Sequence, residues 1–186
     1  ERPVIKKEIT IRFLKDGSIR ERVFPAYSTH HGPVMAKRNS RWISVKSYNR
    51  SLNSLQQSWL RTKAKGLEDY KKVMEMKGNT SNNTVFADSK GNIAYWHGNY
   101  IPIRDTAFNW GKPVDGSIKG TEWKGLHTVN ESVHLYNPSN GWIQNCNSTP
   151  FTAAGIAGPV KSKYPAYMAP DGENFRGINA ARVLAK

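Results

Sequence analysis

The chain begins with alternating apolar and polar residues, a pattern that predicts a β-hairpin. Residues 4–14 alternate in this way, and residues 19–27 are predicted to return as the second strand. Asp16-Gly17 lies between the two segments, and this dipeptide favours a tight turn. Shorter apolar runs at residues 34–35 and 42–45 predict further strands, and we expect the second of them to be buried.

Helical spacing replaces this alternation in the next part of the chain. One helix is predicted over residues 52–64, with Ser51 as its N-cap, and a second over residues 67–77, ended by Gly78. The apolar side chains that share one face of the first helix are Leu52, Leu55, Trp59 and Leu60. We expect the apolar faces of both helices to form part of the core.

The second half of the chain combines a short hairpin with long irregular segments. Residues 85–87 and 93–96 flank a glycine-containing turn and predict two antiparallel strands. Residues 98–141 are rich in Gly, Pro and Asn and predict a long ordered loop, and residues 173–185 predict a terminal helix. Antiparallel strands and separate helices together indicate an α+β fold.

Two asparagines follow a short apolar strand that we predict at Trp142-Ile143. Asn145 and Asn147 are two positions apart, so on an extended strand their side chains point to the same face. Such a pair of amides forms either a hydrogen-bonded structural corner or a set of donors for a substrate. Cys146 lies between them and is interpreted as a small buried side chain, because no Cys/His pattern accompanies it.

Composition limits the classes of protein to which the chain can belong. Its 186 residues suffice for one sizeable domain, and the single cysteine excludes an internal disulfide. No apolar run approaches the roughly 18–20 residues of a membrane-spanning helix. The net charge is +14, and residues 1–65 hold 15 of the 28 Lys and Arg residues. Such a basic surface binds nucleic acid, meets an acidic part of a larger protein, or is simply solvated.

Short segments in a fixed order resemble the β chain of the penicillin amidase family, a branch of the N-terminal-nucleophile hydrolases. The likeness covers nearly the whole chain and depends on the ordered set rather than on one motif. The segments are residues 29–34 (THHGPV), 83–98 (NTVFADSKGNIAYWHG), 102–104 (PIR), 113–116 (PVDG), 122–125 (EWKG), 137–138 (NP), 141–151 (GWIQNCNSTPF), 175–176 (FR) and 182–184 (RVL).

The resemblance implies an N-terminal Ser, Thr or Cys that attacks an amide carbonyl while its own α-amino group takes the proton. This chain starts with Glu1, so we expect the nucleophile-bearing segment and the α chain to lie outside it. Residues 1–186 are then a single-domain fragment of the β chain, inactive alone. The implied fold is a four-layer αββα sandwich, to which the chain contributes antiparallel strands, two central helices and the long loop.

The resemblance also assigns roles to individual residues. Asn147 matches the asparagine whose side-chain N–H enters the oxyanion hole, and Asn145 is given a supporting role in the structural corner. Arg176 best matches an arginine near the nucleophile, because Arg182-Val183-Leu184 follows at the family's spacing, and Arg182 is the competing assignment. A neutral amide suits an oxyanion hole because it donates a hydrogen bond without titrating.

No metal or cofactor is expected in this chain. Its five histidines lack metal-ligand spacing, and Asp88, Asp105 and Asp115 lie in turns that their side chains can cap. We interpret His31, in its Gly-Pro turn, as structural. Members of the family often bind calcium, but we expect most of those ligands outside this chain, so calcium is an expectation for the complete enzyme only.

The implied function is hydrolysis of the amide bond of N-acylated small molecules, such as penicillin-like β-lactams or acyl-homoserine lactones. The partners are then the remaining α and β segments of the parent acylase and the substrate, without nucleic acid or membrane. Self-association of the fragment is expected, and the resemblance implies a periplasmic or secreted protein. The alternative is a basic module that binds nucleic acid or another polyanion.

Overall fold

The computed structural model describes residues 2–48, 51–79 and 82–186. Contacts within the chain divide it into two units, Glu1–Tyr48 and Asn49–Lys186, which are described separately. This division describes how the chain packs on itself and does not test the number of domains. The assignment of residues 1–186 to a single domain stays a prediction.

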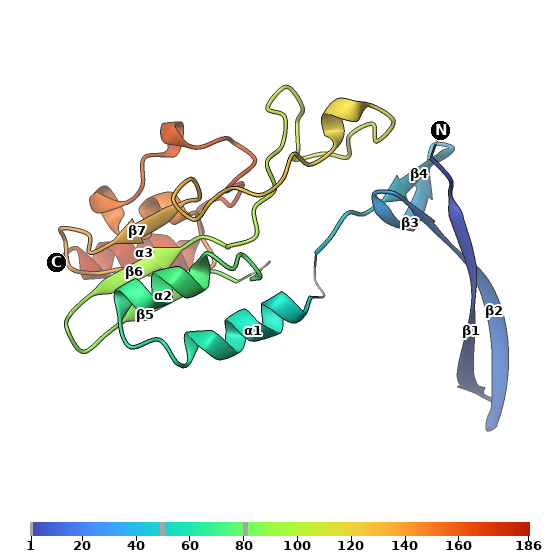
Figure 1. Cartoon of the computed structure of the whole chain (residues 1–186), viewed down its shortest axis with the longest axis horizontal. Helices are drawn as coiled ribbons and strands as arrows, with labels where there is room; N and C mark the ends of the chain where they lie inside the picture. The colour runs from blue at the N-terminus through green and yellow to red at the C-terminus, as the bar shows by residue number, and fades with distance from the viewer. Residues whose placement is uncertain (1, 49–50, 80–81) are drawn as a thin grey trace. The chain divides into compact units, whose positions relative to one another are not determined.

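The first unit is a four-stranded antiparallel sheet in the order β1-β2-β3-β4 (Figure 1). Its strands are β1 (Ile5–Lys15), β2 (Ser18–Thr29), β3 (Gly32–Arg38) and β4 (Arg41–Ser44). The predicted hairpin at Asp16-Gly17 is confirmed, because Lys15 pairs with Ser18. Both turn residues have positive φ, 51° and 73°, as a two-residue hairpin turn requires.

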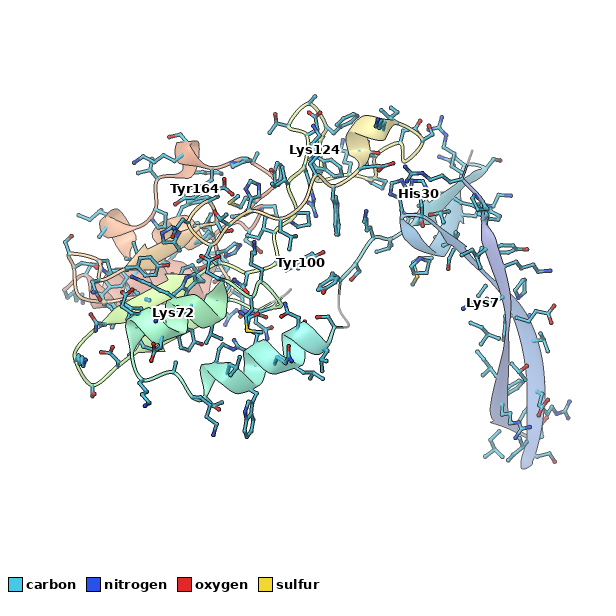
Figure 2. All side chains as sticks on the ribbon, in the orientation of Figure 1. Lys7, His30, Lys72, Tyr100, Lys124 and Tyr164 are labelled. Atoms are coloured by element: carbon cyan, nitrogen blue, oxygen red, sulfur yellow. The ribbon has the colours of Figure 1, made fainter. Side chains whose placement is uncertain are left out.

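Regular pairing in this unit is not accompanied by burial. All residues of β1 are exposed, and Figure 2 shows side chains that project from both faces of the β1–β2 hairpin. Ile9 pairs with Phe24, and one face of the hairpin therefore carries an exposed apolar stripe. The expected burial of residues 42–45 is wrong, because Trp42 is 45% exposed. Self-association through this stripe stays a prediction that sedimentation velocity can check.

Two helices begin the second unit, α1 (Leu52–Arg61) and α2 (Leu67–Met74). The predicted cap is confirmed, because Ser51 Oγ accepts a hydrogen bond from the Ser54 N–H at 3.0 Å. Both helices end earlier than predicted, and Glu75 rather than Gly78 ends α2. The Gly78 N–H instead donates to Gln57 Oε1 at 2.6 Å, and this buried contact joins the two segments.

The predicted core face of α1 is wrong. Its apolar side chains are exposed, with Leu52 at 71%, Leu55 at 69%, Trp59 at 64% and Leu60 at 40%. The one buried residue of the helix is the polar Gln57, whose Nε2 donates to Asn99 Oδ1 at 2.7 Å. Hydrogen bonds of this polar side chain, and not apolar burial, therefore fix the inner side of α1.

A three-stranded antiparallel sheet carries the main core of this unit. Its strands are β5 (Thr84–Ala87), β6 (Ile93–Trp96) and β7 (His134–Tyr136), with β6 in the centre. Met74 of α2 and Trp96 of β6 are 0% and 1% exposed and belong to one apolar cluster. The predicted hairpin at residues 85–96 is confirmed, and the apolar face of α2 forms part of the core as expected.

The rest of the unit has little regular structure but is packed. It contains the short helices η1 (Lys119–Thr121), η2 (Pro150–Thr152), η3 (Gly155–Ala157) and η4 (Lys161–Lys163), and the terminal helix α3 (Phe175–Leu184). Ile101, Val133, Met168 and Ala169 form a second buried cluster. The predicted terminal helix is confirmed. Most of residues 98–141 form the predicted ordered loop, but the prediction missed strand β7 within this range, whose pairing with β6 depends on contacts distant in sequence. No helix among the described residues has the length and apolar character needed to cross a bilayer.

The strand predicted at Trp142-Ile143 is wrong. Among the residues that the structure describes, residues 142–145 have no strand partner, and the backbone bond from Gln144 N–H to Ala153 O, at 2.8 Å, joins them to a helical turn. A short apolar run without a neighbouring strand cannot form a ladder. Helices with antiparallel sheets confirm the α+β class, and the four-layer arrangement stays a prediction.

Candidate active site

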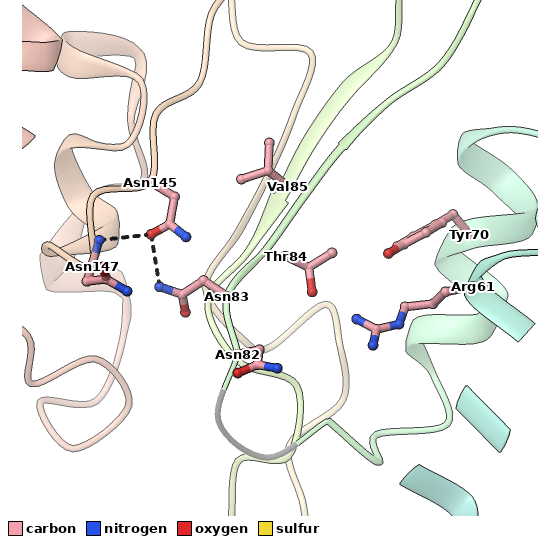
Figure 3. Close-up of a pocket in the computed structure, with 8 residues that line it drawn as sticks. All are labelled: Arg61, Tyr70, Asn82, Asn83, Thr84, Val85, Asn145 and Asn147. Carbon is pink, nitrogen blue, oxygen red and sulfur yellow. Dashed lines mark hydrogen bonds between the residues drawn. The ribbon is translucent and has the colours of Figure 1, made fainter. Parts of the chain in front are cut away.

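Asn147 lies in a tight turn and not on a strand. Its φ of 52° is in the left-handed region, which asparagine adopts more readily than most residues. Asn145 Oδ1 accepts hydrogen bonds from the Asn147 N–H at 3.3 Å and from Asn83 Nδ2 at 3.2 Å (Figure 3). Asn145 thus shapes the turn and connects it to the start of β5. The predicted role of Asn145, as a structural corner that supports Asn147, stays a prediction. A structural corner would make hydrogen bonds such as these two.

Arg176, in the first turn of α3, contacts the Asn147 side chain. Arg176 Nη2 donates to Asn147 Oδ1 at 3.1 Å. Because a guanidinium only donates, this bond places the amide oxygen toward Arg176 and turns Nδ2 away from it. Within the described part of the chain, Nδ2 donates to no protein acceptor, and Asn147 is exposed. The N–H groups of this amide can therefore serve a ligand.

The competing arginine faces elsewhere. Arg182 Nη2 donates to Asn179 Oδ1 at 2.8 Å, a contact within α3. Of the two arginines considered from the sequence, the structure brings Arg176 to Asn147. The predicted role of Arg176 near a nucleophile is not tested by this contact and stays a prediction.

Asn174 holds the backbone of the same turn, and the sequence reasoning missed it. Its Oδ1 accepts from the Gly177 N–H at 3.0 Å and caps α3. Its Nδ2 donates to Cys146 O at 2.9 Å and to Asn147 O at 3.2 Å. A Cβ at Gly177 would lie 2.5 Å from Ser148 Oγ, so glycine is needed for the close approach of α3 to the turn. Asparagine before a helix is a sequence signal for an N-cap, so this role of Asn174 could have been predicted. The contact of its Nδ2 with the Cys146 and Asn147 carbonyl oxygens has no such signal in the sequence.

Asn83 and Asn147 border two cavities. One has a volume of about 450 Å³ (Figure 3) and the other about 290 Å³. The larger cavity is also lined by Arg61, Tyr70, Asn82, Thr84, Val85 and Asn145. The smaller is also lined by His97, Gly98, Tyr100, Ile101, Pro102, Arg104, Tyr167, Met168 and Asp171. A ligand held at Asn147 therefore has space on two sides.

The larger cavity has a polar lining. Thr84 is 6% exposed, and its Oγ1 has no hydrogen-bond partner among the described residues. Burial raises the pKa of the Tyr70 phenol, and the nearby Arg61 guanidinium opposes that shift. The Arg61 guanidinium and the Tyr70 phenol are donors in this lining and suit a ligand that accepts hydrogen bonds.

A hydrogen-bonded chain that runs from the buried Tyr95 and His97 to the exposed Asp171 lies at the smaller cavity. Tyr95 Oη lies 3.0 Å from His97 Nδ1, and His97 Nε2 lies 2.9 Å from Asp171 Oδ2. Burial lowers the pKa of His97, and the Asp171 carboxylate opposes that shift. A neutral imidazole that accepts from Tyr95 and donates to Asp171 satisfies all three groups. Tyr95 and His97 are two positions apart, but no sequence spacing connects them with Asp171, and the sequence reasoning considered His97 only as a metal ligand.

The remaining sequence candidates have local roles. The predicted turn capping is confirmed, because Asp88, Asp105 and Asp115 accept backbone hydrogen bonds from Asn92, Ala107 and Ser117 at 3.0 Å each. Cys146 is half-buried rather than fully buried. Among the described residues, no three His, Cys, Asp or Glu side chains gather as metal ligands would. The expected absence of a dedicated metal, and calcium in the complete enzyme, stay predictions.

Comparison with known proteins identifies the family. The sequence model of the penicillin amidase family matches residues 1–186. The chain belongs to the penicillin amidase family. It is 38% identical over 68 residues to penicillin G acylase from Escherichia coli, a match that covers 37% of this chain and 8% of that protein.

A solved acylase structure shares the fold. The thermostable penicillin G acylase from Alcaligenes faecalis matches with a TM-score of 0.64 and 25% identity, over 78% of this chain and 26% of that one. The chain therefore spans about a quarter of the length of this solved relative. The alternative of a polyanion-binding module receives no support from these matches, and the predicted family resemblance is confirmed.

Proposed function

We propose that this penicillin amidase chain is one segment of an acylase that hydrolyses the amide bond of N-acylated small molecules, and that Asn147 donates to the oxyanion. The observation that carries the proposal is the bond from Arg176 Nη2 to Asn147 Oδ1 at 3.1 Å, which leaves the amide N–H groups for a ligand. Family membership supplies the reaction class.

In the proposed mechanism, an N-terminal serine supplied by another segment attacks the amide carbonyl. Its own α-amino group takes the hydroxyl proton and passes it to the departing amine, which leaves the acyl group as a serine ester. Water, deprotonated by the same α-amino group, then attacks this ester, which releases the acid and restores the serine hydroxyl. Negative charge develops on the carbonyl oxygen during the attack, and Asn147 Nδ2 donates to it. A backbone N–H of the segment that carries the nucleophile is the second donor.

Arg176 acts on the reaction through its contact with Asn147. Because the guanidinium fixes which end of the amide faces the ligand, the donor is in place before the substrate arrives. The positive charge of Arg176 also favours the developing oxyanion. Asn145 and Asn174 hold the turn that carries Asn147.

The substrates of the parent enzyme are proposed to include penicillin-like β-lactams or acyl-homoserine lactones. The remaining α and β segments of that enzyme complete the four-layer sandwich and are the partners of this chain. An exported, periplasmic location is proposed with them, as is a role in antibiotic metabolism. The partial coverage of the solved relative supports a larger parent, because 26% of that chain is matched.

Substitution of Asn147 in the complete parent enzyme tests the proposal. Asn147→Ala is expected to lower the acylation rate by about 10²–10³-fold with little change in substrate affinity, since the donor acts on the transition state. Asn147→Gly gives the same loss without the strain of alanine at positive φ. Asn145→Ala is compared with it and is expected to act mainly on stability and to lower kcat far less, because Asn145 contacts the turn and is not itself the proposed donor. Normal kcat in both Asn147 variants would refute the oxyanion role.

The proposed location of the nucleophile is tested on the chain by itself. Incubation of the purified chain with penicillin G, penicillin V and acyl-homoserine lactones is expected to give no product above buffer. Turnover that persists through repurification would contradict the proposal that the nucleophile belongs to another segment.

A further inference from the structure

Arg104 occupies a rigid position at the end of the segment that follows β6. Pro102 bridges Leu126, and the Ile103 backbone exchanges hydrogen bonds with Gly125 O at 3.0 Å and the Lys124 N–H at 2.9 Å. The Arg104 N–H donates to Tyr167 Oη at 3.2 Å, which connects this segment to the loop that follows η4. The backbone of Arg104 is thus held on both sides.

The guanidinium of Arg104 is held by aromatic rings rather than by a carboxylate. Its Cζ lies 5.2 Å from the ring centre of Trp110, 5.7 Å from that of Trp123 and 5.9 Å from that of Tyr167. The side chain is half-buried, and its buried Nε has no hydrogen-bond partner in the described ranges. Burial lowers the pKa of Arg104, although a guanidinium remains charged in proteins.

The neighbouring carboxylate is engaged elsewhere. Asp105 accepts hydrogen bonds from the Ala107 N–H at 3.0 Å and from Lys124 Nζ at 3.5 Å. Among the residues that the structure describes, Arg104 forms no ion pair. A partly desolvated cation without a counter-ion is unfavourable unless a ligand supplies the charge, and aromatic faces compensate only in part.

Arg104 and Asn147 line the same cavity of about 290 Å³. Asp171 also lines this cavity, but its Oδ2 lies 2.9 Å from His97 Nε2 and is directed toward that ring. A ligand carboxylate gains energy only where it contacts Arg104 more closely than Asp171. The planar fork of a guanidinium matches a carboxylate with two parallel hydrogen bonds, which a point charge cannot do.

We propose that Arg104 forms a carboxylate-binding subsite for the substrate whose amide carbonyl lies at Asn147. The inference extends the proposed function and takes its reaction centre from it. The ligand class is an N-acyl compound that carries one free carboxylate, either on the amine part, as in an N-acyl amino acid, or on the acyl part, as in a dicarboxylic acid monoamide. Arg104 then determines specificity and takes no part in bond cleavage.

Two matched substrate pairs in the complete parent enzyme test this subsite. The amine-side pair is an N-acyl glycine and its methyl amide, and the acyl-side pair is an N-glutaryl anilide and its methyl ester. The unmodified enzyme is expected to prefer the carboxylate member of one pair. Arg104→Met retains an unbranched stem but removes the guanidinium. This variant is expected to lower kcat/KM for the preferred carboxylate substrate by about 10- to 100-fold, mostly by raising KM. The neutral member should change by less than about threefold. The pair that responds identifies which part of the substrate carries the carboxylate.

Arg104→Lys keeps the charge without the fork and is expected to give an intermediate loss. If circular dichroism shows that Arg104→Met does not fold, the Arg104→Lys variant tests the carboxylate subsite in its place. Equal losses on both members of both pairs would assign Arg104 a purely structural role, and no carboxylate preference in the unmodified enzyme would overturn the subsite. Asn147→Ala is measured alongside. If Asn147→Ala leaves kcat unchanged, the oxyanion role of Asn147 is refuted. The carboxylate subsite is still tested in that case, because the Arg104 variants are compared by their KM for the carboxylate and neutral substrates.

Discussion

The two units of the chain show that regular secondary structure and burial are separate properties. The β1–β2 hairpin pairs along its whole length from Ile5 to Ser28, yet every residue of β1 is exposed. The segments after β6 have little regular structure, yet they contain buried side chains such as Val133 at 0% and Met168 at 5%. Backbone hydrogen bonds organise the first unit without a buried core, whereas the second unit combines its sheet and helices with buried side-chain clusters.

The difference matters for the candidate site. A two-stranded ribbon fixes its backbone but leaves both faces open, so it positions residues relative to each other and not to a cavity. In the second unit, side chains such as Asn145 and Asn174 bond to the backbone of the Asn147 turn. The irregular region is therefore the one that can hold a donor in a defined direction.

The largest expected effect follows from the buried cluster of the second unit. Trp96→Ala should lower the free energy of unfolding by about 3–5 kcal/mol, because Trp96 is 1% exposed and its Nε1 donates to Tyr136 Oη at 3.1 Å. Trp42→Ala in β4 is the matched control and should cost less than about 1 kcal/mol. Urea denaturation followed by circular dichroism measures both. Equal losses would break the distinction between the two units.

A smaller effect is expected at the contact between α3 and the Asn147 turn. Gly177→Ala should destabilise the unit by about 1–3 kcal/mol, because the new methyl group overlaps Ser148 in a buried position. Gly172→Ala is the control, since a Cβ there meets no atom of the described residues within 4 Å. Thermal unfolding measures the pair, and a neutral Gly177→Ala would show that α3 can move away from the turn without cost.

The smallest expected effect is a pH dependence at His97. Its lowered pKa means that the folded state binds fewer protons than the unfolded state just below pH 6.5. The contribution of His97 to the free energy of unfolding should therefore be fully present above the pKa of His97 in the unfolded chain. It should decline as the pH falls toward the lower pKa of His97 in the folded protein. Urea denaturation between pH 7.5 and pH 5 should show this decline, and His97→Gln should reduce it. An identical pH slope in the variant would exclude His97 as the source.

Local signals in the sequence predicted local structure well. Asp16-Gly17 and Ser51 each act on the next few residues, and both the hairpin and the helix cap are confirmed. Helix α1 was predicted correctly, but the expected burial of its apolar face was wrong. Helical spacing identifies an apolar face and does not indicate which segment covers it. The strand at Trp142-Ile143 failed because a strand needs a partner, which the segment itself cannot indicate.

The candidate site was only partly predictable. The spacing of Asn145 and Asn147 singled out this pair, family resemblance gave their roles and added Arg176, and the structure brings the three together. The contact of Asn174 with Cys146 O and the pairing of His97 with Asp171 depend on how distant segments pack. No periodicity or spacing rule encodes such contacts, so they appear only in three dimensions.

The shared border formed by Asn83 and Asn147 has a consequence for engineering. The cavity that contains Arg61 and Tyr70 and the cavity that contains Arg104 meet at these two amides and otherwise have separate linings. Mutant libraries can therefore diversify each lining independently while the border residues stay fixed. Gains selected on the two sides should then combine additively where the altered side chains do not touch.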